Sequence, residues 1–284
     1  MRSILVTVDD TPSSLAARAL AAALARQAGA SLRGVTGIEL SDLDKVEAVP
    51  LGGVEYAYDR LKHRERQAVE RRARVAGLPA AFQRSLAEQG LEAPCSIIEA
   101  DVRGALLREI QTCDLVVTGR DTEFHLEPGD GVAPMVEHLI ARGGRPVVVS
   151  GSAAAGTGPV MVAYDGSAPS AKALQMATLL GLFGPAGGAP GAVHVLSVHR
   201  DRAEASGVAA RAGAFLASHG IEATLESRVA ADDPAEFLMR RAGEIGARML
   251  VMGAFGHRGF REILFGSCTR RLFNTAPLPL FIYH

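Results

Sequence analysis

The two halves of the chain repeat each other, and this repeat limits the possible folds more than any other feature. The segment SILVTVDDTPSS near the start matches PVMVAYDGSAPS in the second half, which places Asp9 opposite Asp165. Further on, DLVVTGR matches RMLVMGAFG, and RPVVVS matches LPLFIYH, so that Gly119 corresponds to Gly253. Similarity that recurs in the same order indicates a duplication. The chain must therefore build one architecture twice.

The boundary between the repeats lies in a run of small residues. Residues 150–158 are SGSAAAGTG, a stretch too small and flexible to pack a core. The length of 284 residues is about twice that of a common domain. We therefore expect two domains, at residues 1–150 and 159–284.

Strands and helices alternate along each half. In the second half, strands are expected at 159–164, 192–198, 223–229, 249–253 and 280–283, with helices at 170–182, 202–219, 234–247 and 267–274. Apolar strands that alternate with helices favour a parallel sheet covered on both faces. The fold class is thus α/β, with two tandem Rossmann-like open parallel five-stranded sheets. Ligands of such sheets bind at the carboxyl ends of the strands.

Composition excludes several classes of protein. Hydrophobic residues make up 48% of the chain, which is enough to build a hydrophobic core. The 30 basic residues nearly balance the 31 acidic ones, so neither nucleic acid nor an anionic membrane is an expected partner. No stretch approaches the roughly 20 apolar residues of a membrane span. Three widely spaced cysteines form neither a disulfide framework nor a zinc ribbon. The cytoplasm is the expected location.

The first half is longer by an insertion that falls within residues 42–74. This segment combines a Pro-Gly interruption with a strongly charged helical run. Two interpretations are open: a solvated loop followed by the exposed face of a long helix, or an arm that binds a partner.

The most informative segment is MGAFGHRGFREILFGSCT, residues 252–269. Gly253 ends an expected strand, Gly256 follows after two residues, and Gly266-Ser267 follows after nine more, where the last helix should start. Glycine lets backbone N–H groups approach an oxyanion because no Cβ intervenes. The first turn of a helix adds unpaired N–H groups and the positive end of its dipole. The pattern is typical of a site for a di- or triphosphate.

Other side chains near these glycines could contribute to such a site. The hydroxyls of Ser267 and Thr269 can donate to phosphate oxygens, and Arg258 could add positive charge or be an ordinary exposed side chain. Cys268 lies in the first turn of the helix, where a redox-sensitive role is open.

Here the chain resembles the universal stress protein family, in its tandem two-domain form, within the adenine nucleotide alpha-hydrolase-like superfamily. Gly253, Gly256, Gly266 and Ser267 meet the family's ATP-binding signature G-x2-G-x9-G-[ST]. Asp165, in VAYDGS, matches the acidic residue that follows the family's first strand. The resemblance covers nearly the whole length of both halves.

The resemblance implies an ATP site between the ends of the first and fourth strands. It places Ala163 and Asp165 beside the adenosine, Val195 against the adenine, and Met252 in the lining of the same pocket. From the sequence alone, Val195 and Met252 are equally well explained as ordinary core residues. Asp165 has two possible roles: it could cap the next helix, or it could bind the nucleotide, directly or through Mg²⁺.

The first half departs from this signature. Gly119 is kept, but Thr122 stands where the second glycine should be, and DGVAPMVEHL has no Gly-Ser before its helix. The same loop carries acidic residues that would repel phosphate: Asp121, Glu123, Glu127 and Asp130. We therefore predict that the first domain does not bind ATP in this way. Asp9 is then an inherited cap or a contact for a smaller ligand.

The sequence thus predicts an ATP-binding sensor or regulator of the stress response, with one nucleotide in the second domain. The alternatives are an enzyme that hydrolyses adenine nucleotides slowly and a scaffold that needs no nucleotide. The residues that usually support phosphoryl transfer are missing, because there is no G-x4-GK-[ST] loop or kinase motif set. RPVVVS and LPLFIYH could pair within the chain as a pseudo-dimer. A homodimer and an unidentified protein partner are also open.

Overall fold

The structure is a computed structural model, and it describes residues 1–40, 54–122, 124, 134–151, 156–184, 192–229, 234–254 and 267–283. The first half contains β1 (Ser3–Thr7), α1 (Pro12–Ala28), β2 (Ser31–Glu39), α2 (Val54–Val75), α3 (Leu78–Ala87), β3 (Cys95–Ala100), α4 (Val102–Glu109), a 3-10 helix (Ile110–Thr112), β4 (Leu115–Gly119), α5 (Pro134–Arg142) and β5 (Val147–Ser150).

The second half repeats this order with one α-helix fewer and no 3-10 helix among the described residues. It contains β6 (Val160–Ala163), α6 (Ala168–Leu179), β7 (Val193–His199), α7 (Arg202–Ser218), β8 (Ala223–Val229), α8 (Pro234–Glu244), β9 (Met249–Gly253), α9 (Ser267–Thr275) and β10 (Leu280–Tyr283). These bounds agree with the expected ones to within three residues. The extra helix of the first half is α2, which lies in the expected insertion.

All ten strands belong to one sheet, in the order β3-β2-β1-β4-β5-β10-β9-β6-β7-β8. Each half contributes five parallel strands to this sheet, so the two five-stranded sheets expected from the sequence are joined into one, and the α/β fold class is confirmed. The halves join where β5 and β10 run antiparallel, with Val148 opposite Phe281. The expected pairing of the two last strands within the chain is therefore confirmed. The division into domains at residues 1–150 and 159–284 stays a prediction, because the sheet runs through both.

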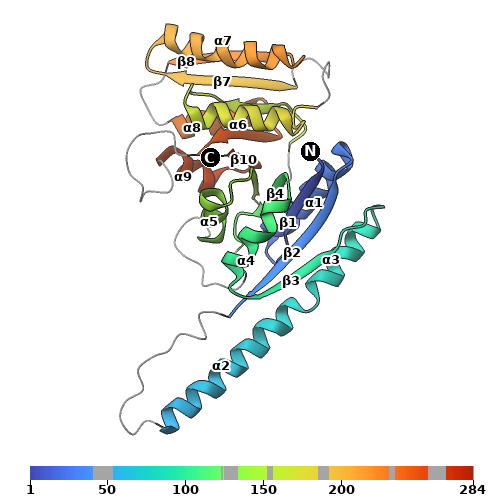
Figure 1. Cartoon of the computed structure of the whole chain (residues 1–284). Coiled ribbons are helices and arrows are strands. Elements are labelled where there is room, and N and C mark those ends of the chain that lie inside the picture. Colours follow the sequence, from blue (N-terminus) through green and yellow to red (C-terminus); the bar gives the residue numbers. More distant parts are fainter. Residues whose placement is uncertain are drawn as a thin grey trace.

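Helices cover both faces of the sheet (Figure 1). On one face, an apolar layer joins the strands to α1, α3, α6 and α7. On the other face, a second layer joins them to α4, α5, α8 and α9. Each layer contains residues of both halves, so the core is continuous across the junction between β5 and β10.

Helix caps explain where several helices begin and end. Thr11 and Ser167 hold the same place in the two repeats, and each side chain accepts a hydrogen bond from the backbone N–H three residues later. Gly220 follows the end of α7 with a φ of 70°, a conformation that favours glycine.

Arg120 links the two halves across the junction. Its backbone follows β4 in the first half, and its guanidinium donates to the carbonyl oxygens of Asn274, at 3.1 Å, and Ala276, at the carboxyl end of α9. The last carbonyls of a helix lack partners within the helix. A side chain of the first half thus completes a helix of the second.

None of the helices described by the structure is long and apolar enough to span a membrane.

Candidate functional site

The candidate site lies at the carboxyl ends of β6 and β9, which are neighbours in the sheet. β6 leads into α6, and β9 precedes α9, so both helices begin at this edge. Ala163 and Gly253 are the last residues of the two strands and are partly exposed. Two helix N-termini and two strand ends therefore converge where the sequence predicted a ligand.

The side chain of Asp165 forms the turn between β6 and α6. Its Oδ1 accepts a hydrogen bond of 2.9 Å from the backbone N–H of Ser167, the N-cap of α6. Burial works to raise the pKa of Asp165, but hydrogen bonds from Ser167 and Ser170 outweigh it and lower that pKa below its ordinary value. Asp165 is thus ionised at neutral pH, and it is exposed to solvent. The geometry establishes the capping contact and leaves the carboxylate at the site's edge.

Gly253 has a structural reason to be glycine. A Cβ at this position would overlap the backbone carbonyl carbon of Pro169 and the nitrogen of Ser170, in the first turn of α6. Gly119 stands in the same relation to α1, where a Cβ would lie 2.6 Å from the nitrogen of Ser14. The strand-end glycine therefore lets a helix pack closely in both halves, whatever else it does in the second.

The structure places the predicted adenine-side residues on both faces of the sheet. Met252 and Ala163 face the layer with α8 and α9. Val195 is fully buried in the opposite layer, between the sheet and α6 and α7. Ala163 and Met252 are thus brought together, and Val195 is kept apart from them.

Val198 was missed by the sequence reasoning. It lies three residues after Val195, near the carboxyl end of β7, and it is partly exposed on the same face as Ala163 and Met252. Side chains alternate between faces along a strand. This alternation puts Val198 on the opposite face from Val195, but the sequence alone does not show which of the two faces borders the ends of β6 and β9.

The segment predicted to bind phosphate is only partly described. Ser267 and Cys268 begin α9, and Thr269 is 7% exposed in its first turn. Gly256, Arg258 and Gly266 lie outside the described residues, as do the side chains of Ser267 and Cys268. The role predicted for these residues stays a prediction. Burial raises the pKa of the two described cysteine thiols, Cys95 and Cys113, to about 11, so both are protonated at neutral pH.

The corresponding edge of the first half is closed by three threonines. Thr7 and Thr118 occupy the places of Ala163 and Met252, and Thr122 occupies that of Gly256. The Thr7 hydroxyl donates to Thr118 Oγ1 at 2.8 Å and lies 3.5 Å from Thr122 Oγ1. All three side chains are fully buried.

Phe124 also fills this edge. It is 2% exposed and belongs to the apolar layer with Val102 and Leu106 of α4. Strand register gives Gly37 of β2 the position that Val198 has in β7. A Cβ on Gly37 would lie 3.0 Å from Cγ of Phe124, so the absence of a side chain there leaves room for the ring. In the first half, the phenyl ring of Phe124 thus occupies the space that lies beside Val198 in the second half.

Asp9, in the turn after β1, is buried. It is 3% exposed, whereas Asp165 is exposed. Its Oδ1 accepts hydrogen bonds from the Thr11 backbone N–H, at 2.9 Å, and from the Thr11 hydroxyl, at 2.6 Å. The capping interpretation of Asp9 therefore has direct geometric support.

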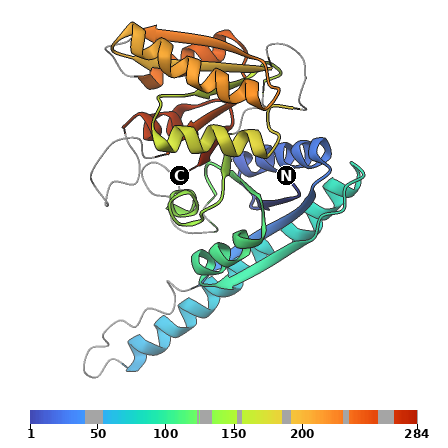
Figure 2. The same ribbon diagram turned by 45° about the horizontal axis from the view of Figure 1, so that its top comes forward.

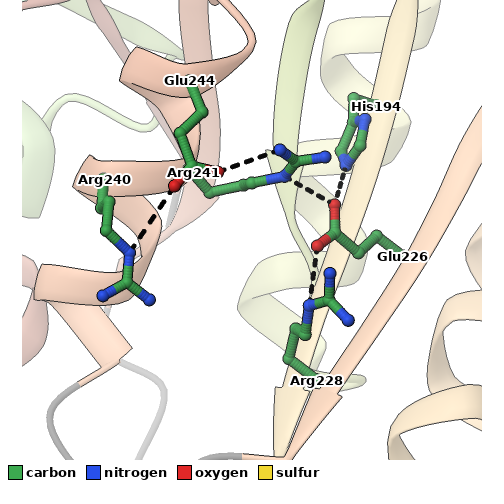
Figure 3. Close-up of polar contacts among 6 residues, drawn as sticks. All are labelled: His194, Glu226, Arg228, Arg240, Arg241 and Glu244. Atoms are coloured by element: carbon green, nitrogen blue, oxygen red, sulfur yellow. Dashed lines mark hydrogen bonds and ion pairs between the residues drawn. The ribbon is translucent and has the colours of Figure 1, made fainter.

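A second polar cluster in the second half lies between β7, β8 and α8 (Figure 3). Glu226 Oε2 contacts His194 Nε2 at 2.7 Å and accepts a hydrogen bond from Arg241 Nε at 2.8 Å, and Arg228 pairs with Oε1 at 2.9 Å. The side chains of His194 and Glu226 are only 8% and 10% exposed. His194 is thus a partnered structural residue. Among the described residues, no group of three or more His, Cys, Asp or Glu side chains could hold a metal ion.

The fold and the strand-end site define a duplicated α/β protein with a Rossmann-like sheet, in which the carboxyl edge of the second half keeps Asp165 exposed and Ala163 partly exposed. Residues 156–284 match the model of the universal stress protein family. The second half of the chain is therefore a universal stress protein family domain.

Solved structures with the same fold extend this similarity to the full length. A universal stress protein from Archaeoglobus fulgidus DSM 4304 aligns with a TM-score of 0.65 at 16% identity, over 99% of this chain and 97% of that one. A protein of unknown function from Pseudomonas aeruginosa PAO1 aligns with a TM-score of 0.56 at 17% identity, over 100% and 92%. At such identities the likeness concerns the fold alone. No curated protein matches the sequence.

Proposed function

We propose that the chain is an ATP-binding regulator of the stress response that holds one nucleotide in its second half. The observation that carries the proposal is the difference between two equivalent strand edges. The edge at β1 and β4 is filled by Thr122 and Phe124, while the edge at β6 and β9 keeps Ala163 partly exposed and Asp165 exposed.

The groups at the carboxyl ends of β6 and β9 suit a nucleoside triphosphate. The N-terminus of α9 follows the glycine signature and supplies unpaired N–H groups and a positive dipole for phosphate oxygens. Ala163, Val198 and Met252 supply an apolar surface on one face for a base. The match of residues 156–284 to the universal stress protein family supports this proposal, because the resemblance implies an ATP site on these strands.

A Mg²⁺ ion fits this edge as a bridge between Asp165 and the phosphates of the nucleotide. Mg²⁺ in nucleotide sites is usually held by one or two carboxylates together with the phosphates and water. Asp165 is a low-pKa carboxylate at the edge and could be that single protein ligand. A metal bound there would neutralise phosphate charge beside the N-terminus of α9.

The proposal is tested on the full chain in two steps. Nucleotide extracted with acid from the purified protein is identified by mass, and ATP is then titrated calorimetrically into nucleotide-free protein. We expect a stoichiometry of one. Gly266→Val should abolish binding because the branched side chain would obstruct the entrance to α9.

The matched control is Gly243→Ala. Gly243 is exposed in α8, and a Cβ there would have nothing within 4 Å, so this variant should bind ATP normally. A stoichiometry of two would contradict the assignment of the first half. Unchanged affinity in Gly266→Val would refute the site.

A further inference from the structure

Helix α2 extends away from the body of the molecule as an arm (Figure 1). A second view shows the same projection, so it does not arise from overlap (Figure 2). Its carboxyl end is anchored: Val75 is fully buried, and Arg72 Nη2 lies 3.0 Å from Glu99 Oε2 of β3. The arm is thus fixed at its base and presents its outer part to solvent.

A stripe of exposed side chains runs along this outer part. Tyr58, Leu61 and Val69 are 57%, 54% and 64% exposed. Residues three or four apart share a side of a helix, so Lys62 and Glu65, both exposed, lie in the same stripe. Lys62 Nζ lies 4.5 Å from the ring centroid of Tyr58, which shows that neighbours in the stripe meet.

The stripe is complementary to itself when reversed. Tyr58, Lys62, Glu65 and Val69 are spaced four, three and four residues apart, an order that is the same from either end. In an antiparallel pair of such helices, Tyr58 meets the second copy's Val69, and Lys62 meets its Glu65, each contact occurring twice. A parallel pair would instead place lysine on lysine and glutamate on glutamate.

We propose that two copies of the chain associate through antiparallel pairing of their α2 arms. A two-fold symmetric contact requires that residue i of one copy meets residue j of the other while j meets i. The stripe satisfies this requirement: the apolar Tyr58–Val69 pairs lie at the two ends of the contact, and the oppositely charged Lys62–Glu65 pairs lie in its middle. Opposite charges across the pair favour this orientation and disfavour the parallel one.

The charge of the remaining arm is compatible with this pairing. Residues 54–75 contain seven Lys or Arg and four Asp or Glu, an excess of positive charge that opposes close approach. Within the stripe, however, Lys62 balances Glu65. Arg60, Arg64 and Arg71 are half-buried and lie on another side of the helix. The excess charge is thus displaced from the contact.

Size sets the expected strength of the dimer. The outer part of α2, from residue 54 to 70, is about 25 Å long at 1.5 Å per residue. Two helices of this length bury less than a standard protein interface, so we expect association in the micromolar range.

The association is measured by analytical ultracentrifugation of the full chain, from about 1 to 200 µM, a range that brackets a micromolar Kd. Val69→Asp should weaken dimerisation at least about tenfold, since it places a charge against Tyr58 in each of the two apolar pairs. Lys62→Glu should weaken it similarly, because each arm then opposes glutamate to glutamate. The double variant Lys62→Glu/Glu65→Lys should restore it, since the opposite charges meet again.

Two controls change the same charges off the stripe. Arg74→Glu and Glu70→Lys alter exposed residues on another side of α2 and should leave association within about twofold of the wild-type value. A wild-type chain that stays monomeric throughout would overturn the proposal, as would a monomer that binds an acidic polymer. A dimer that is insensitive to Lys62→Glu, or that the double variant fails to restore, would do the same.

Discussion

The two halves share a backbone plan and differ in what stands at the edge where a ligand would bind. Both keep a strand-end glycine against a helix, an aspartate in the turn, and a hydroxyl N-cap. In the first half, Thr122 and Phe124 bury this edge, while in the second half Asp165 stays exposed. The framework contacts at this edge are thus retained in both copies, while the side chains that face the edge differ. A shared motif residue is therefore weak evidence for a shared ligand.

The largest expected effect concerns the ring that closes the first half. Phe124→Ala should lower the free energy of unfolding by about 3–4 kcal/mol, because it empties a fully packed place against Gly37 and α4. The backbone of Phe124, with a φ of 50°, also adopts a conformation rarely found for aromatic residues. Urea unfolding measures the loss. Leu179→Ala, at a residue 65% exposed, is the control and should change stability little.

A loss of about 3–4 kcal/mol would show that the Phe124 ring is part of the core, and hence that the two halves differ at this edge in packing as well as in sequence. A loss below about 1 kcal/mol would instead indicate that the first edge is loosely filled and open to a ligand.

The next prediction concerns the strand-end glycine that both halves share. Gly119→Ala and Gly253→Ala should each lower the free energy of unfolding by about 2 kcal/mol, because each new Cβ meets the backbone of a packed helix. Thermal and urea unfolding check both variants. Gly243→Ala is the matched control and should be neutral or slightly stabilising. If Gly253→Ala weakened nucleotide binding without any loss of stability, the glycine would serve the ligand alone.

Much of the fold could be predicted from the sequence because its signals are local. Apolar alternation and the repeated segments were enough to place the strands of the second half, and the matched last strands indicated that β5 and β10 could pair, although not in which register. Residues whose role depends on distant neighbours were harder to identify. Phe124 belongs to a loop, and the repeat has Arg258 instead of an aromatic residue at the matching position, so nothing in the sequence shows that the ring folds back over Gly37.

The candidate site was predicted in part for the same reason. Asp165 and Gly253 follow strands directly, and their positions depend only on the strand ends. Selecting Val198 instead of Val195 requires the register of β6 against β7, which one sequence does not contain. The direction in which α2 projects was equally undetermined, because its charged sequence fits a solvated helix in any orientation.

A third prediction uses the ion network around Glu226 in the second half. Burial works to raise the pKa of Glu226, but hydrogen bonds from Arg241 and His194 and the nearby arginine charges lower it below the ordinary 4.5. A carboxyl group with a lowered folded pKa contributes stability above its unfolded pKa and loses it as pH falls through the folded pKa. The contribution of Glu226 should thus be complete above about pH 5.5, a unit above the ordinary value, and decline in more acid solution.

Glu226→Gln should accordingly cost about 2 kcal/mol at pH 7, with a difference from the wild type that shrinks below pH 4.5. Melting temperatures measured across this pH range check both parts. The first half offers a control, because Arg33 holds the strand position of His194 and pairs with Glu109 of α4 at 2.9 Å, where the two side chains are 30% and 40% exposed. Glu109→Gln should cost less than about 1 kcal/mol, as expected of a solvated pair. Equal costs would remove this difference between the halves.

The smallest expected effect separates the two roles of the strand-end aspartates. Asp165→Ala should lower the free energy of unfolding by about 1 kcal/mol through the lost turn to Ser167, and Asp9→Ala somewhat more, since Asp9 is buried and accepts two hydrogen bonds. The Ser167→Ala variant weakens the start of α6 but keeps the carboxylate. If Asp165 serves only as a cap, both Asp165→Ala and Ser167→Ala should leave ATP affinity and its magnesium dependence unchanged. We expect instead that Asp165→Ala alone reduces the magnesium dependence, measured by titrating ATP with and without Mg²⁺, while Asp9→Ala affects stability only.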